Sequence, residues 1–153
     1  MLFRSVRYHD IPENRIVITG AARFDDFFAM RASTTREEFC EAAGLDPSRP
    51  FVVYLCSSNF VAPQEVAFVR AWADAVRHAV DPAVARCGIL VRPHPAHAEQ
   101  WSGVDLGGIE NAAVWTSPPK VQADPALYDS LHHSAAVAGL NTSAMIEAGI
   151  LGK

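Results

Sequence analysis

A stretch near the carboxyl end of the chain combines residue types that can hold a phosphate group. An apolar run at 135–139 ends in glycine, the small polar residues Asn141, Thr142 and Ser143 follow, and a helical pattern opens at once. This order predicts a strand, a tight turn and a helix, with hydroxyls and unpaired backbone N–H groups at the positive helix end. Such a helix start commonly binds an anion, most often phosphate.

Glu147 adds a carboxylate to the same stretch. It lies four residues after Ser143, so the helical spacing places it on the same face, one turn deeper. A hydroxyl pair with a carboxylate behind it could hold a phosphate and a sugar hydroxyl together. The alternative is that Asn141 or Thr142 only caps the helix and Glu147 lies on the surface. The stretch alone leaves both interpretations open.

A second stretch, Arg92-Pro93-His94-Pro95, begins with the last residue of a predicted strand at 87–92 and ends that strand. The two prolines stiffen the backbone around the imidazole. Arg92 can hold phosphate oxygens in a fork, and His94 can donate to a phosphate or protonate a leaving group, which would make it catalytic. The alternative is a rigid turn whose histidine caps a neighbouring carbonyl.

The elements that would position these residues alternate along the chain. Hydrophobic patterning predicts β-type runs at 15–20, 51–56, 87–92, 112–115 and 135–139, and helices at 35–43, 63–79, 96–101, 124–133 and after 143. Ser33 or Thr34 is expected to cap the first of these helices. We expect residues 1–14 to be a lead-in loop and residues 15–153 to form a single domain.

Such alternation is typical of an open, doubly wound parallel α/β sheet of the Rossmann-like kind. Right-handed crossovers then place all strand-to-helix turns at one sheet edge, where ligands of such sheets bind. The polar residues Ser57 and Ser58, which close the strand at 51–56, join Arg92, His94 and the turn at 141–143 at this edge.

Composition excludes several classes of protein. The 153 residues carry a net charge of -4, and Lys and Arg do not cluster, so a nucleic-acid footprint is not expected. Three widely spaced cysteines argue against a disulfide framework or a zinc site and favour a reducing, cytoplasmic location. No run is long enough to be a transmembrane segment, and no secretory signal is recognisable. We expect no metal site and no cofactor.

Four segments in this order together resemble the C-terminal, nucleotide-sugar-binding domain of GT-B glycosyltransferases: 17–25, 92–95, 128–131 and 139–147. The resemblance is to bacterial capsule and surface-polysaccharide enzymes of the sialyltransferase-like, Kdo-transferase-like and CDP-glycerol glycerophosphotransferase-like types. It implies that His94 contacts the nucleotide phosphate or base and that Thr142 and Ser143 hold the phosphates. It also implies one lobe of a GT-B fold.

The same resemblance sets expectations about the whole protein. Such enzymes have a second, N-terminal lobe and continue beyond the position of Lys153, so the chain is expected to be a truncated lobe that is inactive alone. Its partners would be a nucleotide-activated sugar or polyol donor and the N-terminal lobe, with peripheral membrane association open for the parent enzyme. Two alternatives remain: a sugar-nucleotide 2-epimerase-like domain, and a non-catalytic α/β binding or interaction domain.

Overall fold

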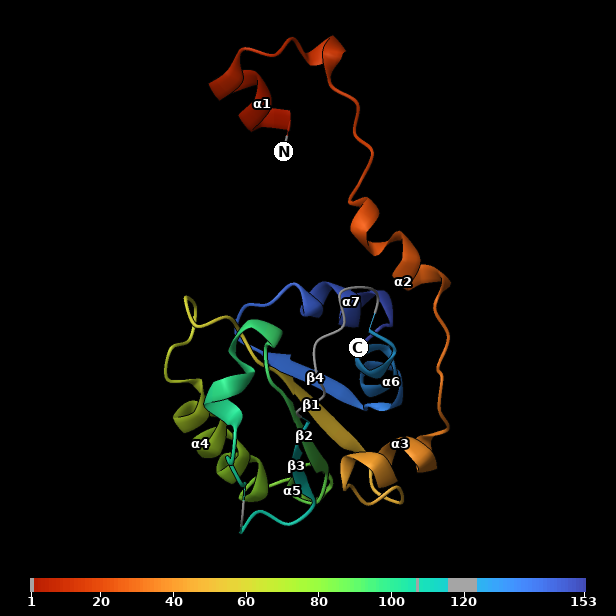
Figure 1. Cartoon of the computed structure of the whole chain (residues 1–153), viewed down its shortest axis with the longest axis vertical. Coiled ribbons are helices and arrows are strands. Elements are labelled where there is room, and N and C mark those ends of the chain that lie inside the picture. The colour runs from red at the N-terminus through yellow and green to blue at the C-terminus, as the bar shows by residue number, and fades with distance from the viewer. Residues whose placement is uncertain (1, 107, 116–123) are drawn as a thin grey trace.

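The structure, a computed structural model, describes residues 2–106, 108–115 and 124–153. At its centre is a parallel sheet with the strand order β3-β2-β1-β4 (Figure 1). The described strands are β1 Phe51–Leu55, β2 Gly88–Arg92, β3 Ala112–Val114 and β4 Ala136–Gly139. The described α-helices are α1 Leu2–His9, α2 Asp25–Ala29, α3 Arg36–Ala43, α4 Glu65–Arg77, α5 Pro82–Ala85, α6 Pro125–His133 and α7 Ala144–Ile150. Short 3₁₀ segments cover Glu13–Arg15, Ala22–Phe24 and Pro95–Trp101.

Helices cover both faces of the sheet. On one face, α3, α6 and α7 pack on side chains such as Phe51, Val53 and Leu90. On the other face, α4 and the segment 101–106 pack on Tyr54, Ile89 and other residues of alternate orientation. Successive strand residues point to opposite faces, so a strand covered on both sides is apolar, as β1 is throughout and β2 is up to Val91. The Rossmann-like α/β fold class predicted from the sequence is therefore confirmed.

The strands and helices that follow Asp46 agree closely with the predicted ones. The predicted helix at 63–79 begins two residues later, at Glu65, and ends two residues earlier, at Arg77. The helix predicted at 35–43 is α3, but its cap is Thr35 instead of Ser33 or Thr34. The Thr35 side chain accepts from the Glu38 backbone while the Glu38 carboxylate accepts from the Thr35 backbone, which is a capping box.

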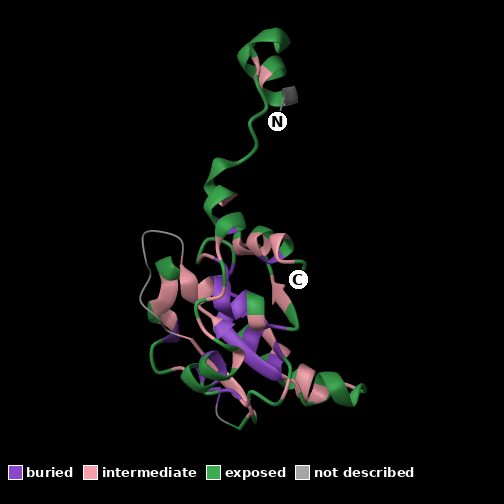
Figure 2. Cartoon of the chain, turned by 90° about the vertical axis from the view of Figure 1, so that its right-hand side faces the viewer, coloured by how far each residue is buried: buried purple, intermediate pink, exposed green. Residues whose placement is uncertain are grey.

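The amino-terminal segment differs most from the prediction. The expected loop at 1–14 contains α1, and the β-type run at 15–20 forms no strand. Val17 and Ile18 are 82% and 77% exposed. Their β-branched side chains favour extended backbone, but a strand also needs a neighbour, and none of the described strands pairs with them. This segment leads away from the sheet (Figures 1 and 2). Along the described side chains, the first buried residue is Phe27.

Candidate functional site

The order of the strands creates a crevice between β1 and β4. From β1 the chain adds β2 and then β3 on one side, and it later places β4 on the other side of β1. The winding direction therefore reverses between β1 and β4. Ligands of open parallel sheets bind beyond the carboxyl ends of the strands at such a reversal. The predicted site residues follow β1, β2 and β4 at this edge.

A small cavity of about 80 Å³ opens at this edge. It is lined by Cys56 after β1, by Arg92 and His94 at the end of β2, and by Thr142 after β4. Asp124, at the start of α6, completes its polar lining. The structure thus brings together three of the predicted residues, Arg92, His94 and Thr142. The described lining of the cavity does not include the other predicted residues, which are Ser57, Ser58, Asn141, Ser143 and Glu147.

The Arg92 side chain is held in place by the protein. One guanidinium nitrogen donates to the Ala126 carbonyl at 2.9 Å, and another donates to the Asp124 carboxylate at 3.0 Å. Its side chain is only 10% exposed, and its guanidinium lies 5.9 Å from the Trp115 ring centre. Burial lowers the pKa of Arg92, and Asp124 counteracts this shift. Arginine stays charged nevertheless, so the cavity contains a cation that one carboxylate already balances.

His94 offers a hydrogen-bond donor to the cavity. Its Nδ1 atom accepts from the Ala96 backbone N–H at 3.2 Å, so in the neutral ring the hydrogen is on Nε2. Burial lowers the pKa of His94, and the nearby His97 lowers it further. The neutral form therefore dominates at pH 7. The sequence alternative of a cap on a carbonyl is wrong, because the ring caps a backbone N–H group.

Ser57 and Ser58 are less accessible to a ligand than the sequence indicates. Ser57 is fully buried. Its backbone N–H donates to both carboxylate oxygens of Glu65 at 2.9 Å, and its hydroxyl oxygen accepts from the Asn141 backbone N–H at 3.2 Å. The Ser58 carbonyl accepts from the backbone N–H groups of Val61 and Ala62 and so closes the turn after β1. Ser57 therefore supports the edge from inside.

The turn after β4 carries the two predicted hydroxyl residues, Thr142 and Ser143, and exposes one of them. Asn141 and Ser143 are exposed, and Thr142 is half-buried against the cavity. The Thr142 hydroxyl oxygen accepts from the Ala144 backbone N–H at 3.5 Å, which is a weak contact. Ser143 occupies the capping position of α7, but its side chain makes no capping hydrogen bond. Because α7 has only seven residues, the cavity side chains matter more for binding than its dipole.

Glu147 lies on α7, where it is half-buried. Burial raises its pKa, the charge of Arg23 lowers it and the charge of Asp124 raises it. Glu147 therefore interacts electrostatically with both groups. The predicted placement one turn behind Ser143 agrees with the described helix.

Sequence reasoning missed two acidic residues at this edge. Asp124 was recognised only as a helix start before Pro125, although its carboxylate also pairs with Arg92. Glu65, in the first turn of α4, is only 1% exposed. The Asp-Pro pair could have indicated a carboxylate near the edge, whereas nothing in the sequence indicates that Glu65 is buried.

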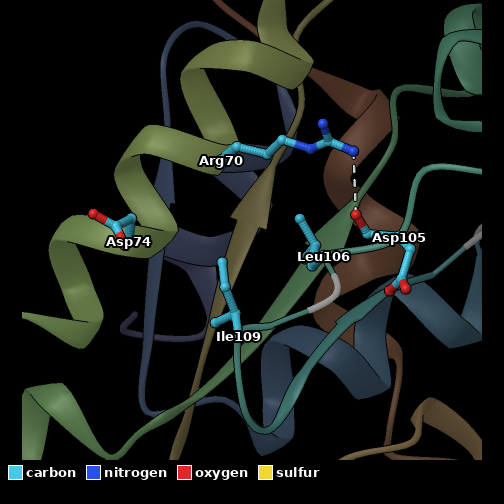
Figure 3. Close-up of a pocket in the computed structure, with 5 residues that line it drawn as sticks. All are labelled: Arg70, Asp74, Asp105, Leu106 and Ile109. Carbon is cyan, nitrogen blue, oxygen red and sulfur yellow. Dashed lines mark hydrogen bonds between the residues drawn. The ribbon is translucent and has the colours of Figure 1, made fainter.

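Larger hollows lie beside α4. One of about 470 Å³ is lined by Arg70, Asp74, Asp105, Leu106 and Ile109 (Figure 3). Arg70 reaches across it and donates to the Asp105 carbonyl at 3.2 Å. None of the predicted residues lines it. It is also away from the strand reversal, so the small cavity is the better candidate site.

Across the described ranges, no three His, Cys, Asp or Glu side chains are grouped to hold a metal ion. In the same part of the chain, none of the helices has the length and apolar character needed to cross a bilayer. Comparison of the sequence with protein families and curated proteins, and of the fold with solved structures, finds no match.

Proposed function

We propose that the carboxyl edge of the sheet binds the phosphate of a nucleotide-activated sugar or polyol, as the donor-binding lobe of a glycosyltransferase-like enzyme. The supporting observation is the cavity at the strand reversal, where Arg92 and His94 at the end of β2 and Thr142 after β4 line one space. Their side chains supply a cation, an N–H donor and a hydroxyl, which together suit a phosphate.

The size of the cavity limits which part of a donor it can hold. A water molecule occupies about 30 Å³ in the liquid, and pockets for drug-sized ligands span about 300–1,000 Å³. A cavity of about 80 Å³ therefore fits one phosphate-sized group. The sugar and base would lie outside, along the exposed turn with Asn141 and Ser143, and Glu147 on α7 would accept from a sugar hydroxyl.

The chemistry at this site would be stabilisation of a leaving group. When the bond between sugar and phosphate breaks, negative charge grows on the phosphate oxygens. Arg92 and the Nε2–H group of His94 would stabilise that charge through preorganised interactions. Because the pKa of His94 is lowered, it would act mainly as a hydrogen-bond donor at pH 7 and not as an imidazolium.

A specific observation favours a second candidate, a non-catalytic α/β binding domain. Asp124 lines the same cavity and neutralises Arg92 at 3.0 Å. An anion must therefore compete with a carboxylate that is already in place. If that competition always favours Asp124, the crevice binds no phosphate.

Calorimetric titration of the full chain separates the two candidates. CMP, CDP, UDP, GDP and inorganic phosphate are titrated into the wild type and into a His94→Ala, Thr142→Ala double variant. We expect one nucleoside diphosphate to bind. Its affinity should fall at least tenfold in the double variant, because the hydrogen-bond donors of His94 and Thr142 are lost. His78→Ala is the matched control, since this histidine is 75% exposed on α4. Failure of every nucleotide to bind the folded chain, or unchanged binding by the double variant, would contradict the proposal.

A further inference from the structure

Glu65 is a buried carboxylate for which the described residues provide hydrogen bonds but no salt-bridge partner. It is 1% exposed and accepts from the Ser57 backbone N–H through both oxygens at 2.9 Å. The Tyr54 hydroxyl donates to it at 3.3 Å. Burying a carboxylate costs free energy, and these hydrogen bonds offset part of that cost. The contacts therefore tie the first residue of α4 firmly to the end of β1.

The connection continues from Ser57 to the turn after β4. The Ser57 hydroxyl oxygen accepts from the Asn141 backbone N–H at 3.2 Å, and Ser57 is fully buried. Asn141 directly precedes Thr142, which lines the cavity. Glu65, Ser57 and Asn141 thus link α4, the end of β1 and the turn between β4 and α7.

Tyr54 and Cys56, which lie beside Glu65, are both neutral at pH 7. Burial and the charge of Glu65 raise the pKa of both side chains. Burial also raises the pKa of Glu65, although the hydrogen bonds from Ser57 and Tyr54 oppose this shift. Among the described residues, only the Ser57 N–H donates to both carboxylate oxygens of Glu65. These two hydrogen bonds restrain Ser57 relative to Glu65.

From these contacts we infer that Glu65 is a positioning residue, which acts through Ser57 to hold the β4–α7 turn and so sets where Thr142 meets the phosphate. The inference rests on the proposed function for its ligand. Its structural part, the restraint of the turn, can be measured without a ligand. Glu65 itself does not line the cavity among the described residues, so it touches no substrate.

The test combines amide hydrogen exchange with phosphate titration on the full chain. Ser57→Ala removes the acceptor of the Asn141 N–H and keeps the backbone bond to Glu65. We expect exchange at Asn141 to accelerate about tenfold and phosphate affinity to fall about fivefold, as for the loss of one hydrogen bond. Ser134→Ala is the matched control, because its buried hydroxyl donates to the Leu131 carbonyl, outside this link.

Two variants at Glu65 separate positioning from general stability. Glu65→Gln keeps one acceptor for the Ser57 N–H, so Asn141 protection and phosphate affinity are expected to stay within about threefold of the wild type. Glu65→Leu removes both acceptors, and Asn141 is expected to lose its protection. If Glu65→Leu does not fold, Glu65→Ala removes the same two acceptors, and unchanged Asn141 exchange in either folded variant overturns the role of Glu65.

The outcomes distinguish the inference from the proposed function. Unchanged Asn141 exchange in Ser57→Ala, or an equal change in Ser134→Ala, overturns the inference whatever binds. If the wild type binds neither phosphate nor a nucleotide while Asn141 responds as expected, the restraint of the turn stands and the proposed function fails. A response of both Asn141 exchange and phosphate affinity supports both.

Discussion

At the scale of single residues, the Arg92–Asp124 pair decides how much positive charge the cavity offers. Asp124 does two things: one oxygen accepts from the Ala126 backbone N–H and caps α6, and the other accepts from Arg92. Asparagine caps helices about as well as aspartate. The charge of Asp124 can therefore be removed while its cap is kept.

We predict that Asp124→Asn strengthens phosphate binding about fivefold, which corresponds to about 1 kcal/mol. The physical reason is that the variant frees the charge of Arg92 and removes a carboxylate that repels the anion. Calorimetric titration with inorganic phosphate measures the change. Asp81→Asn is a close control, because Asp81 also caps a helix before a proline, at the start of α5. Weaker or unchanged binding in a folded Asp124→Asn protein would count against a phosphate site.

At the scale of elements, the close packing of β4 against β1 requires glycine at the strand end. A Cβ atom on Gly139 would lie 2.9 Å from the Leu55 carbonyl oxygen and 3.2 Å from the Met145 sulfur. The first contact is with backbone, which cannot move aside cheaply. Gly149 in α7 is the opposite case, because a Cβ atom there would meet no atom within 4 Å.

We predict that Gly139→Ala destabilises the protein by about 1–3 kcal/mol, as overpacking does, and widens the edge beside the cavity. Gly149→Ala should instead stabilise it by about 0.5–1 kcal/mol, because alanine favours helix over glycine. Urea unfolding of both variants measures the difference. Equal stabilities for the two variants would show that the contact at Gly139 is not restrictive.

Most of the sheet could be predicted from the sequence, because strands buried on both faces are continuous apolar runs. The run at 51–56 and the shorter runs near 90, 113 and 137 all became strands of the sheet. The run at 15–20 is also rich in β-branched residues, but none of the described strands lies beside it. Residue types determine the local backbone preference, whereas strand pairing depends on which other segments of the chain lie beside the run.

The location of the candidate site could be predicted from the sequence, but most contacts of its residues could not. The turns after β2 and β4 were expected at one edge, and Arg92, His94 and Thr142 do line one cavity there. The direction of each side chain depends on neighbours distant in sequence. Ser57 was expected to face the ligand, but it faces Glu65 and Asn141, and Arg92 is paired with Asp124. Sequence spacing does not encode these partners.

At the scale of the whole molecule, a buried aspartate on α6 attaches the amino-terminal segment to the sheet domain. Asp129 is 2% exposed and accepts from the Ser33 backbone at 2.9 Å and from the hydroxyls of Ser33 and Thr34 at 2.7 Å each. The Phe27 ring contacts Tyr128 on the same helix, with ring centres 5.1 Å apart. Nearly all described side chains that precede α3 are exposed (Figure 2), and these contacts with α6 attach the segment to the sheet domain.

The charge of Asp129 makes this attachment sensitive to acid. Burial acts to raise the pKa of Asp129, but the hydrogen bonds from Ser33 and Thr34 outweigh it, so the pKa lies below its ordinary value of 3.8. The folded state therefore holds this proton less tightly than the unfolded chain does. The stability that Asp129 contributes is complete above pH 3.8 and is lost as the pH falls through its folded pKa.

We predict that Asp129→Asn lowers the free energy of unfolding by about 2 kcal/mol at pH 7, because hydrogen bonds to a charged acceptor are replaced by weaker ones. The difference from the wild type should shrink as the pH falls below about 4. Urea unfolding of both proteins from pH 7 to pH 3 measures it. Asp74→Asn is the control, since Asp74 is 70% exposed and its pair with His78 contributes little. A gap that stays constant over this range would mean that the Asp129 charge does not hold the segment, and that packing of Phe27 on Tyr128 is the attachment that matters.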